Sequence, residues 1–122
     1  MSRLYTSEEE IERVVRRFET CATPAGEFHH REHLTVAVWY LQTLSREEAV
    51  EKMREALYRF IDHHGVDRKK YSEEITVFWI CEIAAYLEEI NADVSLVEKC
   101  NGVINAFNSQ ARKPAVPVAN AE

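Results

Sequence analysis

Residues 29–34, with the sequence HHREHL, place three of the chain's five histidines and a glutamate within a single helical turn. His30 and His33 fall in register with the apolar residues that follow, which recur at spacings of three and four up to Leu44. This spacing marks the buried face of an α-helix. We therefore predict a helix over residues 30–44 in which His30 and His33 extend the buried face into the first turn, with His29 on another side.

The same apolar period continues along the rest of the chain, which contains only three glycines and three prolines. It predicts further helices over residues 8–19, 73–90 and 94–107, and one that starts at residue 46 and is stopped by Gly65. N-capping side chains precede these four helices: Ser7, Ser45, Ser72 and Asp93. The middle of the fourth helix of the chain is apolar nearly all round, which is typical of the most buried helix of a fold.

These elements predict an all-α fold. Consecutive helices with short connections pack antiparallel, so we expect residues 1–107 to form a single domain, an antiparallel bundle of four to five helices. Residues 108–122 carry two prolines among alanines and valines and lack the helical period. We expect them to form a loosely ordered C-terminal tail.

The composition excludes several classes of function. The chain of 122 residues is 46% hydrophobic and has a net charge of −6, with its basic residues interleaved among acids. We expect no binding to nucleic acid, because that requires clustered Lys and Arg. No run of eighteen apolar residues is present, so no membrane helix is expected. Without an apolar signal region near residue 1, we expect a cytoplasmic protein with three reduced cysteines.

The predicted topology gathers polar residues at one end of the bundle. The start of the second helix, the end of the third and the start of the fourth share this end, which brings together His30, His33, the pair at residues 63–64, and Glu73. Histidines near a helix N-terminus are held neutral by the helix dipole, and a neutral imidazole can bind a metal or act as a base. With Glu73 turned inward, His30, His33 and Glu73 form the two-histidine, one-carboxylate set that holds Zn, Fe or Ni.

Simpler interpretations of the same residues remain open. The histidines of the second helix can pack and satisfy backbone groups, and His63 and His64 can bind the free carbonyls at the end of their helix. Glu73 and Glu74 are favourable at a helix N-terminus through the dipole alone, by about 0.3–1 kcal/mol.

Two segments carry a resemblance to a known family. Residues 28–34 (FHHREHL) and 71–76 (YSEEIT) resemble an uncharacterised bacterial family of small helical proteins with an aromatic-x-His-x-x-His-Leu motif and a Tyr-His-Glu-Thr-Ile-Thr motif. The resemblance covers residues 28–79. The positions that it places in the family's motifs are His30, His33, Tyr71 and Glu73.

The chain departs from the second motif at Ser72 and Glu74, where the family has histidine and threonine. If that histidine is a metal ligand in the family, this chain lacks one ligand unless His63 or His64 replaces it. The family has no established activity, so the resemblance implies which residues form a site and leaves the reaction open.

Two classes of function follow. The first is metal-assisted chemistry on a small-molecule ligand, with His30 and His33 as metal ligands, Glu73 as a ligand or catalytic base, and Tyr71 as a catalytic hydrogen-bond donor. An alternative enzyme hypothesis needs no metal, and in it His33 and Glu73 act as a general-base pair. The second class is a non-catalytic bundle that forms a homodimer or binds a partner. Its support is the aromatic content of two helices: Trp39, Tyr40, Phe78, Trp79 and Tyr86.

Overall fold

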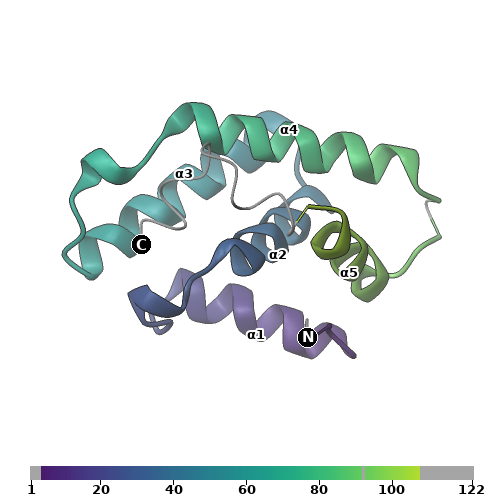
Figure 1. The fold of residues 1–122 in the computed structure, drawn as a ribbon, viewed down its shortest axis with the longest axis horizontal. Helices are drawn as coiled ribbons and strands as arrows, with labels where there is room; N and C mark the ends of the chain where they lie inside the picture. The colour runs from purple at the N-terminus through teal and green to yellow at the C-terminus, as the bar shows by residue number, and fades with distance from the viewer. Residues whose placement is uncertain (1–3, 92, 108–122) are drawn as a thin grey trace.

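The computed structural model describes residues 4–91 and 93–107, and every regular element in these residues is helical. The elements are α1 (Glu8–Glu19), η1 (Ala25–Glu27), α2 (His30–Leu41), α3 (Arg46–His63), η2 (Arg68–Lys70), α4 (Glu73–Glu89) and α5 (Leu96–Phe107), where η marks a short 3-10 helix (Figure 1). The expected all-α, single-domain bundle is confirmed. The expected tail at residues 108–122 lies outside the described residues.

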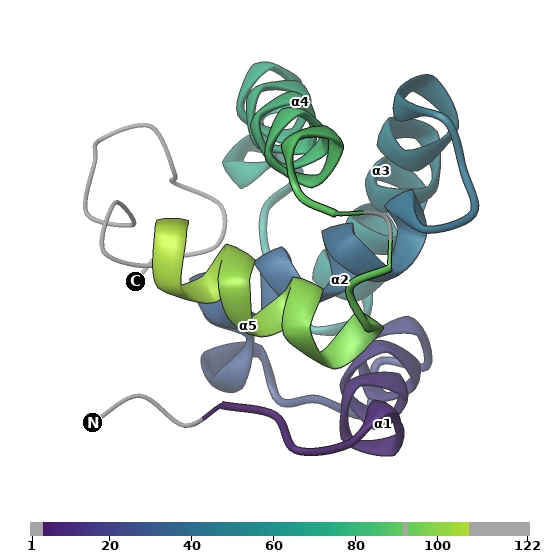
Figure 2. The ribbon, with the colours of Figure 1, turned by 90° about the vertical axis from the view of Figure 1, so that its right-hand side faces the viewer.

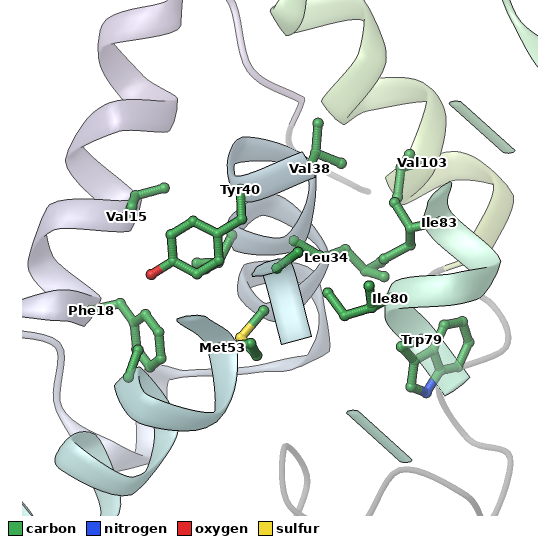
Figure 3. Close-up of a cluster of buried hydrophobic side chains, with 14 of the residues drawn as sticks. Val15, Phe18, Leu34, Val38, Tyr40, Met53, Trp79, Ile80, Ile83 and Val103 are labelled. Carbon is green, nitrogen blue, oxygen red and sulfur yellow. The ribbon is translucent and has the colours of Figure 1, made fainter. Parts of the chain in front are cut away.

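Helix α2 is the centre of the fold. It packs against α1, α3, α4 and α5, and seven of its twelve residues are buried. Side chains from the other four α-helices of the described residues meet around it, among them Phe18 of α1, Met53 of α3, Ile80 of α4 and Val103 of α5 (Figure 3). In Figure 2, α5 is seen from the side whereas α1 and α4 are seen more nearly end-on, so α5 runs across its neighbours.

The prediction that the fourth helix is the most buried one is wrong. Only four residues of α4 are buried, and the side chains of Val77 and Phe78 are 38% and 47% exposed. Helix α4 lies on the outside of the bundle, along α3 (Figures 1 and 2). One of its sides therefore faces solvent even though apolar residues surround its middle. No helix within the described residues is long and apolar enough to cross a membrane.

Most helix ends follow the predicted capping residues. The hydroxyls of Ser7, Ser45 and Ser72 each accept a hydrogen bond from an amide in the first turn of the helix that follows. Gly65 adopts a φ of 72° just beyond α3, and the amide of Val66 donates to the carbonyl of Ile61, which completes the expected glycine stop.

Two helix boundaries differ from the prediction by two residues or more. Helix α2 ends at Leu41 rather than residue 44. Helix α5 begins at Leu96, and the Ser95 hydroxyl accepts from the amide of Glu98 at 3.1 Å, so Ser95 and not Asp93 is placed to cap this helix. Serine and aspartate are both common N-capping residues, so either Ser95 or Asp93 could begin the helix. The apolar period does not distinguish between helix starts two residues apart.

The segment before α1 is fixed to α5 and α2. The backbone N–H of Tyr5 donates to Oδ1 of Asn101 at 2.9 Å, and Nδ2 of Asn101 donates to the Tyr5 carbonyl at 3.0 Å. The Tyr5 hydroxyl shares a hydrogen bond with the buried Thr35 hydroxyl at 2.9 Å. One asparagine thus pairs with both backbone groups of a residue 96 positions away in the chain.

Candidate functional site

The N-terminal parts of α2 and α4, with one residue of α3, line a cavity of about 30 Å³, here called the histidine cavity. It lies where the topology was expected to bring these two helix starts together. Its lining residues are His30, His33, Leu34, Ala37, Met53, Ser72, Ile75, Thr76, Trp79, Ile80 and Ile83. None of them is charged in its ordinary state at neutral pH, and most of the walls are apolar.

The two histidines bring unpaired nitrogen atoms to this cavity. Both ring nitrogens of His30 and Nε2 of His33 are buried, and none has a hydrogen-bond partner within the described part of the chain. The indole ring of Trp79 lies edge-on to His30, with 4.9 Å between ring centroids, and the Phe28 ring lies 4.7 Å from that of His33. An unpaired buried polar group costs about 1–3 kcal/mol, so three such atoms at one place require an explanation.

Burial also determines the protonation of both rings. It lowers the pKa of His33 to about 3, with a further contribution from the nearby His30. It lowers the pKa of His30 as well. The backbone of Phe107 opposes part of the His30 shift but is not in hydrogen-bonding geometry with either ring nitrogen. At neutral pH both imidazoles are therefore uncharged, and each keeps one nitrogen lone pair available.

Glu73 is turned away from the two histidines. Its two carboxylate oxygens accept hydrogen bonds from the Arg54 guanidinium at 2.9 and 2.7 Å, and one of them also accepts from the Tyr71 hydroxyl at 2.7 Å. The Glu73 side chain is 45% exposed and is not part of the cavity lining. Hydrogen bonds from Arg54 lower the pKa of Glu73. The structure brings His30 and His33 together but does not bring Glu73 to them.

Tyr71 belongs to the Glu73 network rather than to the cavity. Its ring packs on that of Tyr58, with 4.8 Å between centroids, and its hydroxyl donates to Glu73. Burial, together with this hydrogen bond, raises the pKa of Tyr71 to about 12. In the residues that the structure describes, no group of three or more His, Cys, Asp or Glu side chains is placed to hold a metal ion.

The remaining histidines do not line the cavity either. His63 is exposed, and the ring of His64 packs on that of Phe60 at 4.6 Å. The backbone N–H of His29 donates to the Glu32 carboxylate at 2.9 Å, which places His29 at the N-terminal end of α2. Neither His63 nor His64 therefore stands in for a third cavity ligand.

Among the cavity residues with oxygen or sulfur in their side chains, Met53, Ser72 and Thr76 were not identified as site residues from the sequence. The Ser72 hydroxyl caps α4 through the amide of Ile75, and the Thr76 hydroxyl donates to the Ser72 carbonyl at 3.1 Å. For Ser72 there was one indication in the sequence, because the resemblance described above implies a histidine at this position. For Met53 the sequence could predict burial only. Its position in the apolar period of α3 gives no information about its distance from α2.

Comparison with known proteins gives no match: no family model matches the sequence, and neither a curated protein nor a solved structure is significantly similar to the chain.

Proposed function

We propose that this protein binds a metal ion at His30 and His33, inside the histidine cavity. The observation that carries the proposal is that His30 and His33 each bring a buried imidazole, with ring nitrogens that have no hydrogen-bond partner among the described residues, to the same cavity. Residues three apart on a helix have Cβ atoms about 5–6 Å apart, so both imidazoles can bind one ion. A bound ion would use the lone pairs that the fold leaves unsatisfied.

Two protein ligands leave coordination positions open on the ion. Open positions are where metal sites bind water or a small molecule and polarise it. Two residues with hydroxyl side chains, Ser72 and Thr76, are part of the lining of the same cavity. The proposed activity is therefore metal binding, with chemistry on a small molecule as its extension.

The test is metal content and thermal stability of protein purified without a metal-affinity tag. Equilibrium dialysis against Zn, Fe, Ni and Cu ions, followed by elemental analysis, should give one ion per chain for at least one metal. The same metal should raise the melting temperature in a concentration-dependent way, because it binds only the native state.

The His33→Ala variant should lose both the bound metal and the melting shift, whereas the matched variant of the exposed histidine, His63→Ala, should keep them. Circular dichroism of His33→Ala checks that the variant is folded. Equal metal content in the wild type and a folded His33→Ala variant would contradict the proposal.

The exposed apolar residues of α4 favour a second function, the formation of a homodimer. Val77 and Phe78 are adjacent in sequence, and both are more than one-third exposed. In a dimer with twofold symmetry both copies bury the same surface, so Val77 and Phe78 of one copy would pack on the same residues of the other. Sedimentation equilibrium should then show a dimer that Phe78→Ser converts to a monomer; a monomeric wild type at all concentrations would contradict this function.

A further inference from the structure

The histidine cavity carries donor atoms of a particular kind. Two of its lining residues, His30 and His33, have imidazole nitrogens and one, Met53, has a thioether sulfur, whereas no lining residue has a carboxylate or a thiol. Thioether sulfur binds soft, monovalent copper, whereas carboxylates suit harder divalent ions. The carboxylate expected to complete a divalent site, Glu73, is held outside the cavity by Arg54.

We infer that the ion bound in the histidine cavity is Cu(I), with the thioether of Met53 as the third ligand beside His30 and His33. This inference rests on the metal site proposed above and names its ion. Helix α2 supplies the two nitrogen ligands and α3 supplies the sulfur. Figure 3 shows the Met53 side chain directed from α3 toward Leu34 of α2. Leu34 lines the histidine cavity together with Met53, His30 and His33.

The absence of acidic side chains from the cavity lining favours a monovalent ion. Moving an ion from water into an apolar surrounding has a Born cost that grows with the square of its charge, so a monovalent ion has about one quarter of the cost of a divalent ion of the same size. The cavity lining contains no acidic side chain that could offset the second charge. Two neutral imidazoles and a thioether leave Cu(I) with a net charge of +1.

The size of the cavity favours a low coordination number. About 30 Å³ has room for about two water-sized guests. An octahedral ion held by only two or three protein ligands needs at least three more, usually water molecules. Cu(I) with two nitrogens and one sulfur needs no water ligand, so it fits the space that is present.

The experiment measures Cu(I) and Zn(II) binding to the same protein under anaerobic, reducing conditions. A chromophoric Cu(I) chelator competes with the protein for Cu(I), and equilibrium dialysis measures Zn(II). The wild type should bind one Cu(I) per chain and bind it more tightly than Zn(II). X-ray absorption of the Cu(I) form should show one sulfur neighbour in addition to nitrogen.

Met53→Leu is the decisive variant, because it removes the sulfur and nearly conserves the side-chain volume. It should weaken Cu(I) binding by about tenfold or more and leave Zn(II) binding unchanged. Ile80→Leu, which alters another cavity wall without removing a donor atom, is the matched control and should bind Cu(I) as the wild type does. Melting curves of both variants confirm that they are folded.

The outcomes separate this inference from the proposed function. Tighter binding of Zn(II) than of Cu(I), or equal Cu(I) affinity in wild type and Met53→Leu, would overturn the Cu(I) assignment while leaving a histidine metal site in place. Absence of binding by every metal would overturn both. Loss of Cu(I) binding in Met53→Leu, with Zn(II) binding retained, would support the three-ligand site.

Discussion

At the scale of single residues, the direction of one carboxylate decides which side chains the candidate site brings together. The apolar period correctly placed His30 and His33 on the buried face of α2, because that period is a property of one helix. The orientation of Glu73 depends instead on Arg54, nineteen residues earlier and on another helix. A pattern within one helix holds no information about such a partner. The sequence could therefore predict two of the three expected ligands' positions and not the third.

The position of Glu73 leads to the first prediction. Glu73→Gln should leave the affinity for metal unchanged, because the carboxylate lies outside the histidine cavity and binds Arg54. Metal titrations of the wild type and of Glu73→Gln check this, with His33→Ala as the variant that should lose binding. A marked loss of affinity in Glu73→Gln would mean that this side chain turns inward when metal binds.

The second prediction concerns the acid sensitivity of the metal-free protein. The ordinary pKa of 6.5 falls to about 3 for His33 in the folded state, and that of His30 is also lowered. Between pH 6.5 and 3 the unfolded chain therefore binds protons that the native state does not. The free energy of unfolding should fall with falling pH in this window, by up to about 1.4 kcal/mol per pH unit for each such proton.

Urea denaturation at pH 7, 6 and 5 measures this slope. His33→Gln should reduce the slope of the free energy of unfolding against pH, because the unfolded chain of this variant cannot bind a proton at residue 33. His63→Gln, altered at an exposed histidine, is the control and should retain the wild-type slope. Identical slopes for the wild type and His33→Gln would show that the pKa of His33 is the same in the folded and the unfolded chain.

At the scale of elements, the contact between α4 and α5 depends on a residue without a side chain. A Cβ atom built at Gly102 of α5 would lie 2.6 Å from the Tyr86 hydroxyl of α4 and 3.5 Å from the ring carbon that bears it. The glycine weakens α5 as a helix but lets the tyrosine approach it. The sequence shows the glycine within a helical period, but the reason for it belongs to the neighbouring helix.

The third prediction is that Gly102→Ala has opposite effects in two backgrounds. In the wild type it should destabilise the protein, because the new methyl group collides with the Tyr86 hydroxyl. In a Tyr86→Phe background that oxygen is gone and the next atom is at ordinary contact distance, so the same change should stabilise by up to about 1 kcal/mol through helix propensity. Free energies of unfolding of the four proteins in this cycle provide the test. Equal effects in both backgrounds would show that the hydroxyl moves aside freely.

At the scale of the whole molecule, the sequence could predict the fold class but not which helix is the most buried. Capping serines and the apolar period are local, and they located most helix ends to within a few residues. Which helix lies at the centre depends on how the others surround it. Helix α4 has the more continuous apolar run, yet α2 is enclosed on more sides, and Phe78 of α4 remains exposed.

The fourth prediction concerns the link between Tyr5 and Asn101, which ties the segment before α1 to α5. Asn101→Ala removes both partners of the Tyr5 backbone groups and should lower the free energy of unfolding by about 1–3 kcal/mol. Asn101→Asp keeps the acceptor and loses the donor, so its effect should be smaller. Chemical denaturation measures both variants. A stability of Asn101→Ala equal to that of the wild type would mean that water replaces the amide at no cost.

The central place of α2 also affects how the chain folds while it is being synthesised. A ribosome releases α2 well before α5, at about 5–20 residues per second. Until α5 emerges, the side of α2 that it covers stays in contact with water, and the asparagine that holds the early segment does not yet exist. Nascent chains that end between α4 and α5 should therefore be the species most in need of a chaperone.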